Sequence, residues 1–257
     1  MPLILVTNDD GIHASGIEVL TDIARQFGKT VVIAPAEGQS GMSHAITVKF
    51  PLRIKKISEE KDLTLYSCTG TPVDGVKLAL AQLLDQEPDL IISGINHGSN
   101  SSSSVVYSGT MGAAIEGCIN SIPAIGFSLL DHSATADFEA SRPYVKRIIE
   151  MVLENGLPQG VCLNVNIPAV PKQEIKGMKV CRQNRGIWRE EFDKRMDPRS
   201  QEYYWLTGEF YDLEPESADT DQWALLNNYV SVVPVQPDMT AYKFLDTLKS
   251  WDFSNNV

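Results

Sequence analysis

The sequence predicts a three-layer α/β/α fold built on a doubly wound, mostly parallel sheet. Short apolar runs rich in β-branched residues alternate with amphipathic helical segments over the first 180 of the 257 residues. Polar loops directly follow several of these runs, as loops do at the carboxyl ends of parallel strands. We expect a single α/β domain over 1–257, with its core over about 1–180 and a C-terminal arm with closing elements over about 181–257.

The opening segment predicts a strand, a polar loop, a helix and a second strand. Residues 3–6 (LILV) are entirely apolar, as in a buried parallel strand. Ser15 and Glu18 match a capping box with Ser15 as the N-cap, and the helical spacing of apolar residues continues until Gly28. Residues 31–34 (VVIA) predict the next strand, which completes a right-handed βαβ unit.

The same alternation continues towards residue 180 and predicts a Rossmann-like sheet. Thr71 and Pro72 begin a helix, with proline at its first position. The other core elements are expected as strands at 89–93, 123–128 and 161–168, and as helices from Thr110 to Ile119 and from Arg142 to Glu154.

The C-terminal part of the chain predicts an arm that is not part of the core. Aromatic and charged residues alternate from Trp188 to Tyr211, which indicates a β-hairpin. Because exposed apolar surface of this kind marks interfaces, we expect the arm to mediate assembly into a homodimer or a homotetramer. Residues 230–235 predict a further core strand, and residues 240–251 a closing helix.

Composition limits the partners and the compartment. The net charge of −11 disfavours binding to a nucleic-acid backbone, which needs a basic face. No apolar run approaches the length of a membrane span, and the first residues lack the basic start of a secretory signal. The four cysteines are scattered without a CxxC pair, as in a reducing cytosol. We therefore expect a soluble, cytoplasmic protein that binds neither nucleic acid nor a membrane.

Three polar loops follow strands whose carboxyl ends share one edge of the predicted sheet. Their candidate ligands are Asn8, Asp9 and Asp10 in the first loop, Ser40 and Ser43 in the second, and Asn96 and Asn100 in the third. Two carboxylates, a hydroxyl and an amide suit Mg²⁺, Mn²⁺ or Ca²⁺ better than zinc. A buried pair of carboxylates needs a cation or shared protons, whereas a solvated turn tolerates the pair. Spacing alone leaves both alternatives open.

Ser108, Gly109 and Thr110 precede a helix of small residues. The free N–H groups at a helix N-terminus bind anions, so this segment is a candidate phosphate site; a plain helix cap is the alternative. The sequence has no Walker A loop, no GxSxG elbow and no GxGxxG fingerprint, which disfavours a dinucleotide-dependent oxidoreductase. The four histidines lack the spacing of metal ligands.

These motifs together resemble the SurE survival proteins, a family of metal-dependent nucleotidases. The resemblance covers nearly the whole chain and follows the order of the family's motifs. It rests on NDDGIHASGI at the start, QSG at 39–41, TGTPVDGVKLAL at 69–80, SGINHGSN at 93–100, YSGTMGAAIEG at 107–117 and LNVNIP at 163–168. The chain departs from the family at Gln39, where arginine is typical.

The resemblance implies a metal-dependent phosphomonoesterase that hydrolyses nucleoside 5′-monophosphates, with 3′-monophosphates and short polyphosphate as further candidate substrates. It implies one divalent ion per subunit, held by Asp9, Asp10, Ser40 and Asn96. It places the phosphate at Ser108, Gly109 and Thr110, and catalytic roles at Asp9, Asn96 and Ser108. The remaining expected pocket residues are Asn8, Ser43 and Asn100.

Asp9 is the candidate for orienting or deprotonating the attacking water, and a covalent aspartyl-phosphate on Asp9 is the alternative route. The rival function is a nucleotide-binding stress protein without catalysis. Against it, paired acids repel a phosphate unless a cation lies between them.

Overall fold

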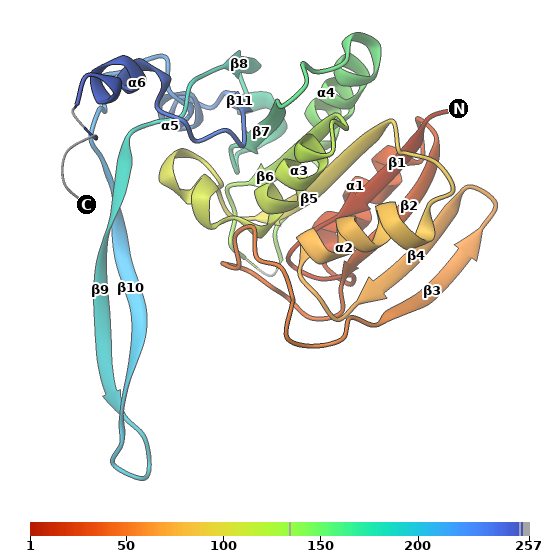
Figure 1. The fold of residues 1–257 in the computed structure, drawn as a ribbon, viewed down its shortest axis with the longest axis horizontal. Coiled ribbons are helices and arrows are strands. Elements are labelled where there is room, and N and C mark those ends of the chain that lie inside the picture. Colours follow the sequence, from red (N-terminus) through yellow and green to blue (C-terminus); the bar gives the residue numbers. More distant parts are fainter. Residues whose placement is uncertain (134, 252, 254–257) are drawn as a thin grey trace.

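The protein is described by a computed structural model over residues 1–133, 135–251 and 253. A nine-stranded sheet runs through its centre in the order β3-β4-β2-β1-β5-β6-β7-β11-β8 (Figure 1). Its strands are β1 (Leu3–Thr7), β2 (Lys29–Pro35), β3 (Ile54–Glu60), β4 (Leu63–Cys68), β5 (Leu90–His97), β6 (Ala124–Leu129), β7 (Cys162–Ile167), β8 (Met178–Val180) and β11 (Val230–Val235).

The sheet is parallel from β4 to β7, and antiparallel pairs occur towards its two ends. β3 runs antiparallel to β4, and β11 runs antiparallel to β7. The chain first builds outwards from β1 through β2 to β4, and later outwards on the other side of β1 through β5, β6 and β7. The order therefore reverses between β1 and β5, where ligands bind in open α/β sheets.

Helices cover both faces of the sheet and separate two hydrophobic cores. α1 (Ser15–Ala24) and α4 (Arg142–Asn155) pack on one face through residues such as Leu20 and Ile149. α2 (Pro72–Leu78) and α3 (Gly109–Ile119) pack on the other face, where Val76 and Met111 are buried. The predicted three-layer, doubly wound α/β/α fold is confirmed.

Shorter helical segments complete the chain. They are η1 (Ala79–Leu83), η2 (Ser102–Tyr107), η3 (Lys172–Glu174), α5 (Asp221–Leu226) and α6 (Tyr242–Lys249).

The helix starts differ in how well the sequence predicted them. Thr71 caps α2 as part of a complete capping box, because its side chain accepts from the Asp74 N–H at 3.1 Å and Asp74 accepts from the Thr71 N–H. The capping box predicted at Ser15 is wrong: the N-cap is Ala14 and no side chain caps this end. A Cβ at Gly16 would lie 2.0 Å from the Ile95 carbonyl oxygen, so tight packing on β5 replaces the cap.

α1 also ends four residues earlier than expected, at Ala24 instead of Gly28. The chain turns after Ala24 because Gly28 packs against the backbone of Pro2, only 2.0 Å from where a Cβ would lie. Tertiary packing thus sets both ends of this helix.

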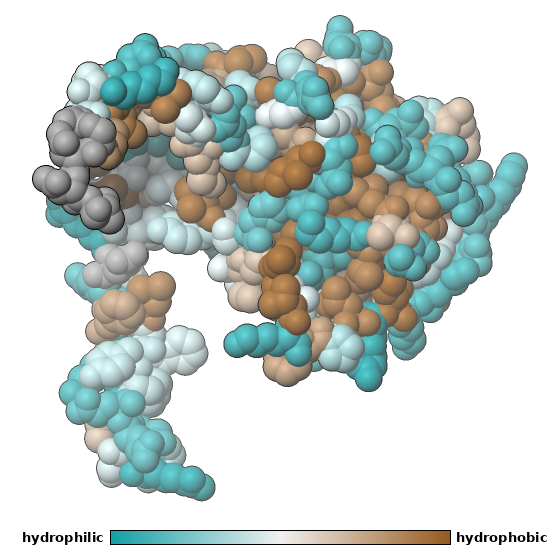
Figure 2. All heavy atoms as spheres, in the orientation of Figure 1, coloured by the Kyte–Doolittle hydropathy of each residue, from teal (hydrophilic) through white to brown (hydrophobic). Residues whose placement is uncertain are grey.

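The predicted hairpin arm is present as β9 (Gly186–Met196) and β10 (Glu202–Asp212), which pair antiparallel along their whole length. The arm extends away from the sheet (Figure 1). Figure 2 shows hydrophobic and weakly polar surface on the half of the arm nearer the body and a hydrophilic tip. Its exposed large side chains include Phe192, Trp205 and Leu206.

Two further observations concern the whole chain. Among residues 1–133, 135–251 and 253, no helix is both long and apolar enough to cross a membrane. Cys68, Cys118, Cys162 and Cys181 are all buried free thiols.

Candidate active site

The candidate site lies at the carboxyl ends of β1 and β5, the neighbouring strands at the reversal of strand order. β1 runs into the loop that carries Asp9 and Asp10, and β5 contains Asn96. The two strands pair in register, with Thr7 opposite Ser93. Sheet topology alone therefore brings together residues that are almost 90 positions apart in the sequence.

Asn8 forms the turn that presents the two acids. Its side chain is fully buried, donates from Nδ2 to the Gly11 carbonyl at 2.9 Å and accepts from the Gly11 N–H at 3.2 Å. Gly11 has a φ of +105°, which favours glycine. Asn8, expected among the pocket residues, thus holds the loop in shape.

Asp9 is buried against the start of α3. Only 3% of its surface is exposed, and the Thr110 hydroxyl donates to its Oδ1 at 2.5 Å. A Cβ at Gly109 would lie 2.8 Å from the Asp9 Cβ and 2.9 Å from its Oδ2. The absence of a side chain at Gly109 is therefore what lets the carboxylate sit at the helix N-terminus.

Both acids have raised pKa values. Burial raises the pKa of the Asp9 carboxyl to about 6, against its ordinary value of 3.8, and the charge of Asp10 adds to this rise. Burial also raises the pKa of Asp10, whose Oδ2 accepts from the His97 backbone N–H at 3.2 Å. In the part of the chain that the structure describes, no lysine, arginine or histidine forms an ion pair with either acid.

This arrangement fits a divalent cation with oxygen ligands. Two neighbouring carboxylates without a protein cation leave negative charge that a bound ion would neutralise. No group of three or more His, Cys, Asp or Glu side chains that could hold a metal occurs within 1–133, 135–251 and 253. An ion here would therefore need hydroxyl or amide oxygens as well, and the sequence predicts Ser40 and Asn96 for this role.

Asn96 precedes His97, whose backbone N–H contacts Asp10, and one side of the Asn96 amide is in use. Its Nδ2 donates to the Gly98 carbonyl at 2.8 Å. This hydrogen bond fixes the orientation of the amide group, and Oδ1 lies on the side of the amide away from Nδ2. Its surface is almost entirely buried. The fixed orientation makes the oxygen atom available as a ligand without a rotamer change.

The second polar loop meets the acids through its backbone. The Gln39 N–H donates to the Asp9 carbonyl at 2.7 Å, and a Cβ at Gly38 would lie 3.5 Å from the Asp10 carbonyl. Ser40 follows directly and is exposed to solvent. The structure thus brings the first three predicted metal ligands onto two adjoining loops.

Further contacts hold the second loop to the helical layer. Ser43 donates from its hydroxyl to the Val106 carbonyl at 2.6 Å, so it anchors the loop to the end of η2. His44 Nε2 lies 3.0 Å from a carboxylate oxygen of Glu116 on α3, whose other oxygen is 2.7 Å from the Lys77 ammonium. No pattern in the sequence indicates Glu116, because 72 residues separate it from His44.

Ser108 and Asn100 have structural contacts of their own. Ser108 is the N-cap of α3, and its Oγ accepts from the Met111 N–H at 3.0 Å. Asn100 is buried and donates to Ser128 Oγ at 2.7 Å, while its backbone N–H donates to Asn166 Oδ1 at 2.7 Å. Asn100 therefore anchors the third loop to β6 and β7.

A family model described as "Survival protein SurE" matches residues 4–190 of the chain. The chain belongs to the SurE family. The resemblance found in the sequence is thereby confirmed.

Individual SurE relatives match over nearly their full length. The chain is 55% identical over 254 residues to a protein from Flavobacterium psychrophilum, covering 98% of each. It is 43% identical over 251 residues to one from Chlorobium limicola, covering 98% of this chain and 96% of that protein. Both are named 5′-nucleotidase SurE. The crystal structure of the SurE protein from Aquifex aeolicus superposes with a TM-score of 0.83 at 39% identity, covering 96% of this chain and 98% of that one.

The raised pKa of Asp9 predicts how the stability of the metal-free protein depends on pH. A carboxyl whose pKa is higher in the folded than in the unfolded state binds more protons when the protein is folded. Its contribution to the free energy of unfolding is therefore lost as the pH rises from about 4 to about 6. The rise from 3.8 to about 6 corresponds to about 3 kcal/mol at most. Urea unfolding in chelator should therefore show a fall in the free energy of unfolding over this range that is smaller in Asp9→Asn, where only Asp10 still contributes. Equal pH profiles for the two proteins would contradict this prediction.

Proposed function

We propose that this chain hydrolyses nucleoside 5′-monophosphates to nucleoside and phosphate, with a divalent cation bound at Asp9 and Asp10. The enzyme class, a 5′-nucleotidase, is the one that the names of its relatives at 43–55% identity give. The observation that carries the proposal is the pair of adjacent acids without an ion-pair partner at the switch point, with Asp9 buried against the N-terminus of α3 and Asp10 half-buried beside it.

The residues proposed to hold the ion are Asp9, Asp10, Ser40 and Asn96. When bound, one divalent ion per subunit (Mg²⁺, Mn²⁺ or Ca²⁺) would polarise a phosphoryl oxygen and lower the pKa of a bound water. The raised pKa of Asp9 supports this set, because an ionised carboxylate in this environment is stable only beside a positive charge. Gln39 replaces the family's usual arginine and leaves the four ligands unchanged.

The chain's own groups would position the phosphate and the attacking water. Asp9 lies where a carboxylate can orient the water or take its proton, and Asn96 would fix the geometry from the opposite strand. Ser108, Gly109 and Thr110 form the first turn of α3, whose N-terminal dipole favours the charge that develops on the phosphoryl oxygens. Direct attack by Asp9, giving an aspartyl-phosphate, is the second route that these positions allow.

A non-catalytic nucleotide-binding protein is the second candidate function. Phosphate release from AMP with and without Mn²⁺, with a chelator control, separates the two. The same assay extended to 3′-monophosphates, sugar phosphates and short polyphosphate defines the range of substrates.

We predict that Asp9→Asn loses activity by orders of magnitude while the fold is retained, since the change weakens the ion site and removes the candidate base. Asp85→Asn is the matched control, because Asp85 is an exposed carboxylate outside the site. Phosphate release at saturating Mn²⁺ and far-UV circular dichroism measure the two properties. The assignment of Asp9 fails if its variant keeps half of the wild-type activity.

Ser108→Ala tests whether this side chain acts in the reaction or only caps α3. If Ser108 stabilises the transition state, kcat falls roughly 10- to 1000-fold with little change in KM. A role confined to capping would cost about 1 kcal/mol of stability and leave kcat intact. Thr220→Ala is the control for a lost cap, because Thr220 caps α5 in the same way, accepting from the Trp223 N–H at 3.2 Å.

We also propose that the chain assembles through its arm and acts in the cytoplasm as one domain. β8 and β11, from the C-terminal third, belong to the central sheet, which supports a single folding unit. The four free cysteines suit a reducing compartment. The arm's exposed apolar side chains favour a homodimer or homotetramer.

Light scattering at micromolar concentration should therefore give a mass of at least two chains, and replacing the segment 188–211 by a short turn should lower it. A wild-type protein that is monomeric under these conditions would exclude assembly through the arm.

A further inference from the structure

A cavity of about 430 Å³ lies between the arm and the turn that leads into α3. We call it the arm-root cavity. Its lining residues are Ser104, Tyr107, Trp188, Leu206, Thr207 and Gly208. None of these side chains carries a charge at neutral pH, and the volume is in the range of small-molecule sites. The cavity therefore suits a flat, uncharged group.

Two aromatic rings with accessible faces border this cavity. Tyr107 is 57% exposed and Trp188 is 44% exposed. The Trp188 indole N–H donates to Ser104 Oγ at 3.3 Å, and its ring meets Phe210 edge-on with centroids 5.8 Å apart. These contacts fix the orientation of the indole ring and leave much of its surface free.

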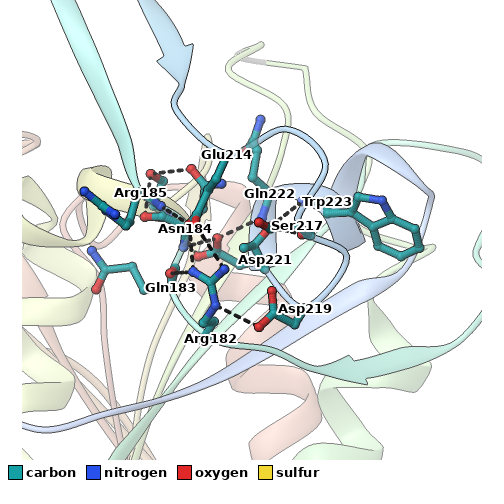
Figure 3. A network of polar contacts seen from close by, with 12 residues as sticks. Arg182, Gln183, Asn184, Arg185, Glu214, Ser217, Asp219, Asp221, Gln222 and Trp223 are labelled. Carbon is teal, nitrogen blue, oxygen red and sulfur yellow. Dashed lines mark hydrogen bonds and ion pairs between the residues drawn. The ribbon is translucent and has the colours of Figure 1, made fainter.

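The walls of the cavity are held together by a buried carboxylate. Asp221 is fully buried and accepts from the backbone N–H groups of Ser102, on η2, and Asn184, just before the arm, both at 2.9 Å. Figure 3 shows Asp221 and Asn184 at the centre of this polar network. Ser102 Oγ also donates to the Asn184 carbonyl at 3.1 Å. The root of the arm is therefore fixed to η2, the segment that ends at Tyr107.

The cavity adjoins the proposed phosphate site along the chain. Tyr107 directly precedes Ser108, and consecutive Cα atoms are about 3.8 Å apart. The Tyr107 carbonyl also accepts from the Ser43 N–H at 3.1 Å, which joins it to the loop that carries Ser40. Tyr107 is therefore the residue that joins this cavity to the proposed phosphate site in the chain.

We propose that the arm-root cavity binds the nucleobase of the substrate, with Tyr107 and Trp188 as stacking surfaces. This inference rests on the proposed nucleotidase function. Stacking on aromatic rings tolerates every base, because each base has a π-face. The cavity should therefore distinguish nucleotides from phosphate esters that lack a base. It should distinguish much less between nucleotides with different bases.

The test compares AMP with ribose 5-phosphate, which lacks the base. Trp188→Leu and Tyr107→Leu should each lower the ratio of kcat/KM for AMP to kcat/KM for ribose 5-phosphate by about tenfold, within the range for losing one stacking surface. Trp188→Tyr and Tyr107→Phe keep an aromatic ring and should restore most of the ratio.

Trp205→Leu is the matched control. Trp205 is 60% exposed on the same arm and does not line the cavity. Its neighbour Leu206 does, and successive side chains of a strand point to opposite faces. This variant should keep the wild-type ratio. Light scattering shows whether the arm variants alter assembly; if they do, Tyr107→Leu decides, because Tyr107 lies outside the arm.

A binding measurement without phosphate or metal provides a second readout. Adenosine added to the protein in chelator should quench indole fluorescence in the wild type and in Trp205→Leu, but not in Trp188→Leu. An unchanged substrate ratio in both cavity variants, or an equal loss in Trp205→Leu, overturns the nucleobase assignment. A wild-type protein that hydrolyses neither substrate but is quenched by adenosine overturns the nucleotidase proposal and retains the cavity as a nucleoside site.

Discussion

The whole site depends on one electrostatic constraint: two adjacent carboxylates are withdrawn from solvent at the end of β1, Asp9 almost fully and Asp10 in part. Asp9 and Asp10 repel each other, and burial raises the pKa of both. The fold partly offsets this cost with the Thr110 hydroxyl, the N-terminus of α3 and, for Asp10, the nearby His97, although within the described residues neither acid forms an ion pair. The unbalanced charge that remains is the basis on which we propose an ion site at this end of the sheet.

Rigid packing around the acids keeps them in this costly arrangement. Gly109 allows α3 to approach Asp9 more closely than any other residue would. The loop that carries Ser40 is attached at both of its ends, to Asp9 through Gln39 and to α3 through the His44–Glu116 contact. A site whose loops are fixed before the ion binds loses little further conformational freedom on binding.

The sequence predicted the buried strands that are continuous apolar runs, such as LILV, because such runs are typical of the centre of a parallel sheet. It did not predict the edge strand β3, whose sequence IKKISEE is polar and mostly exposed, or its neighbour β4, where polar residues interrupt the apolar ones in LTLYSC. The capping box at Ser15 failed because packing of Gly16 on β5 determines the start of α1. Local patterns therefore predict an element well only where its own burial stabilises it.

The residues of the candidate site likewise fall into those that the sequence predicted and those that it did not. Asp9, Asp10 and Asn96 could be found from the sequence because they follow predicted strands, whose order fixes where they meet. Their metal and catalytic roles stay predictions. Glu116 and Asp221 could not be found, because their partners are separated from them by 72 residues in one case and by 37 and 119 in the other. Such contacts depend on the folded arrangement and leave no periodic signal.

The overall charge of the chain sets the way in which the protein can bind its substrate. A net charge of −11 repels an anionic nucleotide at long range, so electrostatic steering by the whole protein cannot provide affinity. Attraction has to be local, from an ion between the acids and from the dipole of α3, and salt screens longer-range repulsion within about 10 Å. Uncharged contacts therefore contribute a larger share of the binding affinity, since stacking on an aromatic ring does not depend on the net charge of the protein. An aromatic cavity next to the proposed phosphate site is therefore the kind of feature that an acidic nucleotidase needs.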